Sequence, residues 1–269
     1  YEQDYSYYFY AALLDAADRG VKVRIVVDGK LGKLSGSLDT LGRLLQNHNN
    51  IEFYYFNMIN LLDPSGLLVL LHDKVMLVDG QIAIVGGVNM GTGAFLGNYD
   101  MEIMISNGAE NGCCGAMARY FDGLIANELT ARIVSDFVDL AAKTRYIDAY
   151  REFYGRSELA TAEIDYKTQG VAVDKATFLT NEVSADKKSP IILQAVYNLT
   201  ENSQKATFVT PYALLENDKK REIKRLAASC SDFTLVTNSL YNTRNVAYAD
   251  YYYTRKAYID DDIRLLEYQ

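Results

Sequence analysis

The dipeptide Asp79–Gly80 constrains the fold of this chain more than any other short stretch. It joins two apolar segments, Lys74–Val78 and Gln81–Val85. A two-residue turn of this composition favours a β-hairpin, because both central residues must adopt positive φ angles, which Asp and Gly tolerate. The turn also fixes which residues of the two strands face each other. We therefore predict an antiparallel hairpin over residues 74–85.

The predicted register carries several polar side chains to the open end of the hairpin. It pairs Lys74 with Val85 and His72 with Gly87, and since side chains alternate along a strand, His72 and Lys74 point to the same side. Gly87 leaves space opposite the imidazole, and Asn89 continues that face further along the chain. A histidine, a cation and an amide donor are thus expected beside a gap.

These residue types suit phosphoryl transfer. A neutral imidazole can attack phosphorus, and its ordinary pKa of about 6.5 makes the neutral form available at physiological pH. A lysine ammonium and a neutral amide can hold the non-bridging oxygens as negative charge builds up. Each residue also has an ordinary interpretation, as a core histidine, a solvated lysine, a turn-forming Asp79 or a strand-ending pair Gly86–Gly87. Their occurrence together at this spacing favours phosphoryl transfer.

Helical and strand patterns alternate on either side of the hairpin. Before it we predict a helix ending at Gly20, a strand Val21–Val27, a helix over 37–46 and a strand Ile51–Phe56. After it we predict strands at 101–106, 175–179, 205–209, 233–237 and 263–267, and helical segments over 109–159, from 189, over 216–228 and over 245–259. This order is typical of an α/β fold with a mixed, largely parallel sheet.

The two halves of the chain repeat the same pattern. Val23–Asp28 corresponds to Phe233–Asn238 and Ile51–Tyr54 to Ile263–Leu266, at an offset of roughly 210 residues. We place the boundary in the polar stretch 160–170, which gives a first half over 1–160 and a second over 161–269. The counterpart of His72 would then lie about a dozen residues beyond the last one. We therefore expect the second half to be incomplete.

Composition narrows the possible partners. The formal net charge is −8, so a nucleic-acid substrate is disfavoured, because no overall positive field gathers phosphate backbones. The cysteines Cys113, Cys114 and Cys230 lack the spacing of a zinc site, and we interpret them as buried small side chains in a reducing compartment. No apolar run is long enough for a transmembrane helix. We expect a chain without metal that is cytoplasmic or peripheral at the cytoplasmic membrane face.

The segment from His72 to Asn89 also resembles a known motif. The pattern H-x-K-x4-D-x6-G-G-x-N is matched at its fixed positions by His72, Lys74, Asp79, Gly86, Gly87 and Asn89. The chain resembles the phospholipase D superfamily and, in flanking segments such as Ala16–Arg24 and Asn238–Leu240, its bacterial cardiolipin synthase-like branch. The resemblance implies a pseudo-twofold α-β-α sandwich in which two such motifs share one active site.

The resemblance also implies roles for individual residues. His72 would form a phosphohistidine, Lys74 and Asn89 would bind the phosphoryl oxygens, and Asp79 would support the catalytic site. A histidine from the second motif would protonate the leaving alcohol. No cofactor is implied. The substrate would be a phospholipid at a membrane surface, cleaved by hydrolysis or phosphatidyl transfer.

Several alternatives remain at this stage. The other histidine, His48, lies in a polar turn, where we expect a solvated side chain. The chain carries only one half of the site, so it could be a catalytically incomplete scaffold or interaction module. A homodimer could instead pair two copies of His72. A nucleic-acid phosphodiesterase is the remaining alternative within the superfamily.

Overall fold

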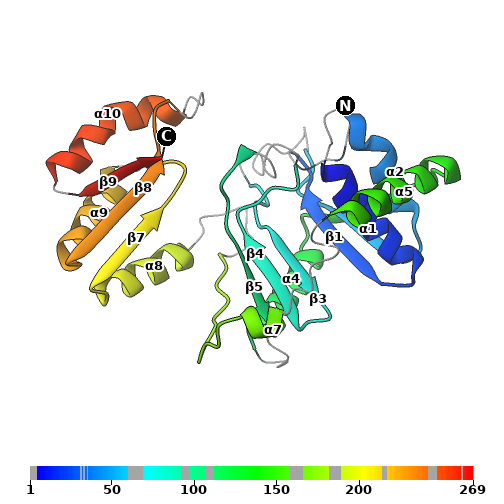
Figure 1. The fold of residues 1–269 in the computed structure, drawn as a ribbon, viewed down its shortest axis with the longest axis horizontal. Coiled ribbons are helices and arrows are strands. Elements are labelled where there is room, and N and C mark those ends of the chain that lie inside the picture. Colours follow the sequence, from blue (N-terminus) through cyan, green and yellow to red (C-terminus); the bar gives the residue numbers. More distant parts are fainter. Residues whose placement is uncertain are drawn as a thin grey trace. The chain divides into compact units, whose positions relative to one another are not determined.

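The computed structural model of the chain has the predicted α/β architecture, with helices alternating with strands along the sequence (Figure 1). It describes residues 5–30, 32, 34, 36–59, 69–91, 97–106, 112–157, 166–181, 189–213, 217–241, 247–261 and 263–268. These residues divide into two compact units, one up to Phe178 and the other from Leu179 onward. None of the helices in these ranges combines the length and the apolar character that a bilayer-crossing segment needs.

The first sheet of the first unit has helices on both faces. Strand β1 (Val23–Asp28) pairs in parallel with β2 (Ile51–Phe56), and β2 pairs antiparallel with β6 (Thr130–Ile133). The parallel pair requires a crossover, which the short helix η1 (Gly36–Leu38) and α2 (Asp39–Asn47) provide.

In β1 and β2, most apolar residues at odd-numbered positions face one side of this sheet, and Val26 and Phe56 face the other. One face packs against α1 (Tyr5–Asp18), α2 and α5 (Leu140–Arg156), with Leu14, Leu41 and Phe53 almost fully buried. On the other face Phe56 packs with Val69 and with Leu124 of α4 (Cys113–Ile125). This is an α-β-α arrangement, in agreement with the predicted fold class.

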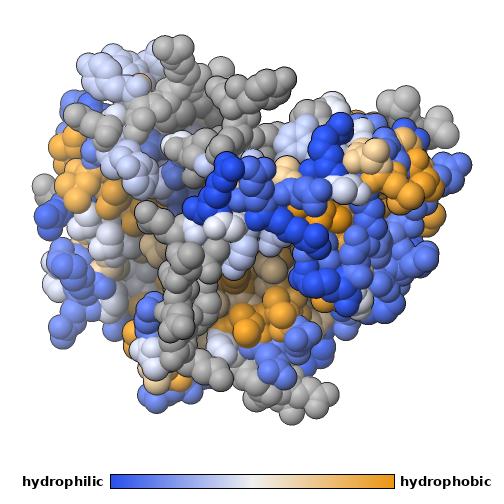
Figure 2. Space-filling view, turned by 45° about the vertical axis from the view of Figure 1, so that its right-hand side comes forward, coloured by the Kyte–Doolittle hydropathy of each residue, from blue (hydrophilic) through white to orange (hydrophobic). Residues whose placement is uncertain are grey.

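The second sheet is the predicted hairpin with one further strand. Strands β3 (Val75–Val78), β4 (Ile82–Gly86) and β5 (Glu102–Ser106) are antiparallel neighbours in that order. One face packs on α4 through Ala83, Cys113 and Cys114. The other face carries exposed apolar side chains of Met76, Val78, Ile82, Ile84 and Met104. Figure 2 shows apolar side chains reaching the surface among hydrophilic ones. All three cysteines are free and buried, as predicted.

The predicted register of the hairpin is wrong by one residue. Asp79 and Gly80 do adopt positive φ angles of 52° and 65°, and Gln81 N donates to Val78 O at 3.0 Å. The ladder, however, pairs Val78 with Ile82, because Gln81 is an extra residue on the β4 side. Lys74 therefore lies opposite Gly86, to which its carbonyl oxygen is bonded at 3.4 Å, and not opposite Val85.

Two further predictions of elements were wrong. The predicted helical region 109–159 is divided into α4 and α5 by the strand β6. The predicted strand 175–179 has no strand structure, and Ala176 and Phe178 instead pack onto the cluster around Cys113. Alternating apolar residues such as Ala176 and Phe178 can be buried against a helix as well as in a β-strand. A short helix, α7 (Tyr166–Gln169), precedes this segment.

The second unit is a parallel sheet with helical crossovers. Its elements are α8 (Ile191–Glu201), β7 (Lys205–Val209), α9 (Asn217–Ser229), β8 (Asp232–Asn238), α10 (Ala247–Asp260) and β9 (Arg264–Tyr268). Strand β8 pairs in parallel with both β7 and β9. The bounds of five of them, and the start of α8, were predicted within a few residues.

Both units contain the same strand–helix–strand arrangement. In the first, β1–α2–β2 forms a parallel pair, and in the second β8–α10–β9 does. Even the bond after the first strand recurs: Gly29 N donates to Phe56 O at 2.7 Å, and Ser239 N donates to Tyr268 O at 2.8 Å. The repeat predicted from the sequence is therefore present in the topology of these strands.

Candidate active site

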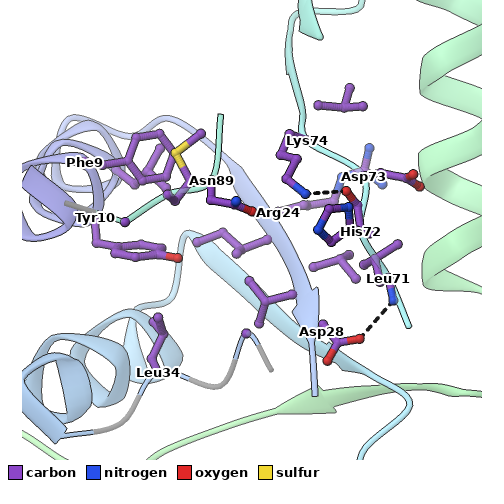
Figure 3. A pocket seen from close by; sticks show the side chains of 18 of the residues that line it. Phe9, Tyr10, Arg24, Asp28, Leu34, Leu71, His72, Asp73, Lys74 and Asn89 are labelled. Carbon is purple, nitrogen blue, oxygen red and sulfur yellow. Dashed lines mark hydrogen bonds between the residues drawn. The ribbon is translucent and has the colours of Figure 1, made fainter. Parts of the chain in front are cut away.

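His72 and Lys74 lie on an extended segment between the two sheets of the first unit. The segment runs from Val69 to Lys74, directly before β3, and Asn89 follows β4. All three polar side chains line one cavity of about 620 Å³. Figure 3 shows His72 and Lys74 on one side of this cavity and Phe9, Tyr10 and Leu34 on another. The structure thus brings together the predicted histidine, lysine and asparagine.

The far wall of the cavity is largely apolar. It is formed by α1, β1 and η1, and its apolar residues include Phe9, Leu13, Ile25, Val27, Leu34 and Leu38. The sequence analysis did not identify this wall, because its residues lie 34 or more positions before His72. A cavity with a few polar groups at one side and apolar side chains elsewhere is typical of sites for amphiphilic small molecules.

The imidazole of His72 has no partner among the residues that the structure describes. Its side chain is exposed, and within the ranges the structure describes it makes no hydrogen bond. Neither ring nitrogen is bonded to a described residue. Beside it, Lys74 Nζ donates to the carbonyl oxygen of His72 at 2.7 Å, which holds the ammonium next to the ring (Figure 3).

Lys74 has an altered acidity. Burial in the cavity wall lowers the pKa of Lys74 below its ordinary value, while the carboxylates of Asp73, Asp100 and Glu102 act in the opposite sense and favour the charged form. Lys74 lines the cavity together with a second cation, Arg24 on β1. A phosphate oxygen would be drawn to the Lys74 ammonium in surroundings that contain less water than the open surface.

The pair Gly86–Gly87 leaves room for two carboxylates. A Cβ at Gly86 would overlap the carbonyl oxygen of Met101 and the carboxylate of Glu102, and a Cβ at Gly87 would lie 3.0 Å from Asp100 Oδ1. Glu102 Oε1 accepts a hydrogen bond from Val88 N at 2.7 Å. The glycines therefore allow Glu102 to fix the chain just before Asn89.

Asp79 does not line this cavity. It lies in the hairpin turn and borders a second cavity of about 400 Å³, together with Lys22, Arg24 and Tyr120. The structure therefore does not bring Asp79 to His72, and the supporting role expected for it remains a prediction. Asp73, which the motif does not specify, accepts a hydrogen bond from Tyr120 Oη and lines both cavities.

His48 differs from the prediction of a solvated side chain. Its side chain is only 15% exposed, and its Nε2 lies 3.0 Å from Asp18 Oδ1. Its Nδ1 accepts from Asn50 N at 3.1 Å, which places the ring proton on Nε2. Lys143 binds the same Asp18 oxygen at 2.5 Å. The turn between α2 and β2 folds back onto α1 and α5, so His48 is a structural residue.

Asp28, Lys30 and Asn57 are further polar residues near the site. They follow or end the parallel strands β1 and β2, and each contacts the backbone of residues 69–71 or its own loop. Their position could have been predicted, because the carboxyl ends of neighbouring parallel strands commonly border functional sites. Within the described ranges, no three His, Cys, Asp or Glu side chains are arranged to hold a metal ion.

Comparison with known proteins finds one family model and several related proteins. Residues 5–125 match the family described as "Cardiolipin synthase, PLD-like domain". The chain is 24% identical over 287 aligned positions to cardiolipin synthase C of Escherichia coli (strain K12), an alignment that covers 96% of this chain and 60% of that protein. The chain thus spans about three-fifths of that relative's length.

Other similarities cover shorter parts of the chain. An uncharacterized protein of Helicobacter pylori (strain ATCC 700392 / 26695) is 35% identical over 103 residues, which are 34% of this chain and 20% of that protein. A crystal structure of Nuc, a phospholipase D family member from Salmonella typhimurium, aligns with a TM-score of 0.35 and 22% identity over 47% of this chain and 73% of that one.

Proposed function

We propose that the His72 cavity cleaves or transfers phosphodiester groups of phospholipids through a phosphohistidine, a proposal that the match of residues 5–125 to the "Cardiolipin synthase, PLD-like domain" family supports. The observation that supports this most is the composition of the cavity. His72, Lys74 and Asn89 line it together with a largely apolar wall. A phospholipid has a phosphodiester beside long apolar chains, and both parts find matching surroundings here.

In this mechanism His72 is the nucleophile. One ring nitrogen attacks phosphorus, the bond from phosphorus to the leaving alcohol breaks, and a phosphohistidine forms. The ammonium of Lys74 and the amide of Asn89 bind the non-bridging oxygens, whose negative charge increases as the reaction proceeds. Water or a second alcohol then attacks phosphorus and releases His72, which gives hydrolysis or transfer.

The leaving alcohol also needs a proton. In the described ranges the second histidine of the chain, His48, is bonded to Asp18 and Asn50 and does not line the cavity. We assign the general acid to a histidine of a second such motif, other than His48 and His72 of this chain. A second copy of His72 in a homodimer is the other source, and light scattering of an active chain distinguishes a dimer from a monomer.

The charge of the site favours a lipid over a nucleic acid. The whole chain has a net charge of −8, and Asp28 and Asp73 line the cavity beside Arg24 and Lys74. A nucleic acid would need a run of cations along its backbone. An absence of salt-dependent binding to DNA is therefore expected. The protein would act as a peripheral protein on a membrane surface.

The test is headgroup release and phosphatidyl transfer from labelled phosphatidylglycerol vesicles. When a second motif or a second copy of the chain supplies the general acid, we expect release that is lost in His72→Asn and retained in the matched variant His48→Asn. Release that persists in His72→Asn would remove the proposed nucleophile. Equal background signals from all three would leave the chain as a catalytically incomplete scaffold or interaction module.

A further inference from the structure

A buried carboxylate ends β1 and binds the segment that carries His72. Asp28 is only 6% exposed. Its Oδ1 accepts from Lys30 N at 2.8 Å, and its Oδ2 accepts from Leu71 N at 2.9 Å (Figure 3). A buried carboxylate is stable only when its oxygens are paired or bonded, so these amide donors and the carboxylate fix each other. Leu71 is the residue directly before His72.

A buried amide holds the same segment from the end of β2. Asn57 is 8% exposed and has a positive φ of 48°, and its own N donates to Leu129 O at 2.7 Å. Its Nδ2 donates to Val69 O at 2.8 Å. Lys30 Nζ donates to the same carbonyl oxygen at 3.1 Å. The left-handed backbone at Asn57 turns the side chain toward the segment, a conformation that Asn tolerates better than most residues.

These bonds fix the backbone directly before His72, and the contacts of Val69 with Phe56 and of Asp73 with Tyr120 add to them on either side. The ladder of β3 begins only at Val75. In the described ranges the ring of His72 itself has no hydrogen-bond partner. The place of the imidazole therefore depends on where its own backbone is held. The backbone bonds to Asp28 and Asn57 lie one and three residues before it.

We propose that Asp28 and Asn57 are positioning residues for His72, and that they form a clamp on residues 69–71. Neither touches the reacting atoms. The clamp sets the distance from the imidazole to a phosphodiester held by Lys74 and Asn89, a consequence that rests on the proposed function. A misplacement of about 1 Å can reduce turnover about 10²-fold. Substrate binding through Lys74 and the apolar wall is left unchanged.

The first measurement is amide hydrogen exchange at Leu71, followed by NMR. We expect exchange to be about tenfold faster in Asp28→Ala, as the loss of one buried hydrogen bond predicts, and intermediate in Asp28→Asn, which keeps one oxygen acceptor. Asn57→Gly removes the amide without strain at the positive φ, and should also raise exchange of the segment. Unchanged exchange in Asn57→Gly and both Asp28 variants would overturn the clamp.

The chain offers a matched control. Asn47 Nδ2 also donates to a backbone carbonyl at 2.8 Å, that of Ser135, but far from the cavity lining. We expect Asn47→Gly to leave exchange at Leu71 unchanged. Thermal unfolding of each variant shows whether it is folded, and Asn57→Gly keeps the test decisive if Asp28→Ala does not fold.

The second measurement separates positioning from binding. With a soluble phosphodiester, Asn57→Gly and Asp28→Asn should lower kcat up to about 10²-fold and leave KM within about twofold. A kcat equal to wild type in a variant with faster Leu71 exchange would overturn the positioning role. If turnover by the wild-type chain does not depend on His72, the proposed function fails, while the exchange rates still decide whether the clamp exists.

Discussion

The two histidines of the chain lie in opposite surroundings. His48 is mostly buried, with one ring nitrogen against Asp18 and the other accepting from the backbone of Asn50. His72 is exposed in a cavity, and within the described ranges its ring is bonded to nothing. The residue type is the same, but both ring nitrogens of His48 are used by the fold, whereas neither ring nitrogen of His72 is bonded to a residue that the structure describes.

This contrast shows how a structural histidine differs from a chemical one. For His48 the side chain is fixed directly, by groups that bind its ring. For His72 the backbone is fixed, by Asp28 and Asn57, while the ring is left exposed. Exposure alone does not identify a catalytic residue. A histidine ring without hydrogen-bond partners, on a fixed backbone and beside a cation, is a candidate for a catalytic role.

The largest expected difference between the two histidines is in turnover. His72→Asn should reduce phosphodiester cleavage by about 10³-fold or more, because the nucleophile is removed, whereas His48→Asn should change it less than about threefold. Initial rates at saturating substrate measure both. A comparable loss of turnover in the two variants would mean that the different surroundings of the two histidines do not distinguish a nucleophile from a structural residue.

The His72 region should be sensitive to a single methyl group. Gly86→Ala places a Cβ against the backbone of Met101 and the carboxylate of Glu102, and should cost about 1–3 kcal/mol of unfolding free energy. Gly123→Ala on α4, where a Cβ meets nothing within 4 Å, is the control and should be neutral or slightly stabilising. Urea unfolding measures both. A neutral Gly86→Ala would contradict the packing of β5 against β4.

Removing each of the two imidazoles should change stability by different amounts. His48→Ala should lower the free energy of unfolding by about 1–2 kcal/mol, because the partners of a mostly buried ring are lost. His72→Ala should change it by less than about 0.5 kcal/mol, because this ring is exposed and unbonded. The denaturant midpoints of the two variants measure both changes in stability. Equal midpoints would weaken the assignment of His48 as structural.

The smallest expected effect is on the pH dependence of stability, through Asp18 beside His48. Burial would raise the pKa of Asp18, but hydrogen bonds from Lys143 and His48 outweigh it, so the pKa is lowered in the folded chain. A lowered carboxyl pKa stabilises the fold above the unfolded value of about 3.9, and this contribution is lost as pH falls through the folded pKa.

Asp18→Asn should therefore make the decline in stability on acidification shallower. Unfolding midpoints between about pH 3 and pH 6 measure the slope. Asn47→Gly, which changes no titratable group, serves as the comparison and should leave the slope unchanged in the acid range. An unchanged slope in Asp18→Asn would show that Asp18 is not tied to His48 and Lys143 as described.

The sequence predicted local features of this site better than distant ones. The positions of the hairpin strands, and the placement of His72 and Lys74 on the same side of the chain, follow from spacing alone. The register between β3 and β4 does not follow from spacing. Whether Gln81 belongs to the turn or pairs with a residue of β3 depends on the packing of the whole sheet. The apolar wall and the bonds from Asp28 and Asn57 join segments that no local pattern connects. The strand predicted over 175–179 was wrong because its apolar residues find a helix to pack on, and not a partner strand.

The most direct measurement is detection of a phosphohistidine. Bis(p-nitrophenyl) phosphate is a suitable substrate, because its leaving group departs as a stable anion and does not require the general acid that the chain lacks in our proposal. The chain should release p-nitrophenolate in a burst and carry a phosphoryl adduct on His72, located by mass spectrometry of the acid-free digest. His72→Asn should give neither. An adduct on His48, or a burst without any adduct on His72, would contradict the assignment of His72 as the nucleophile.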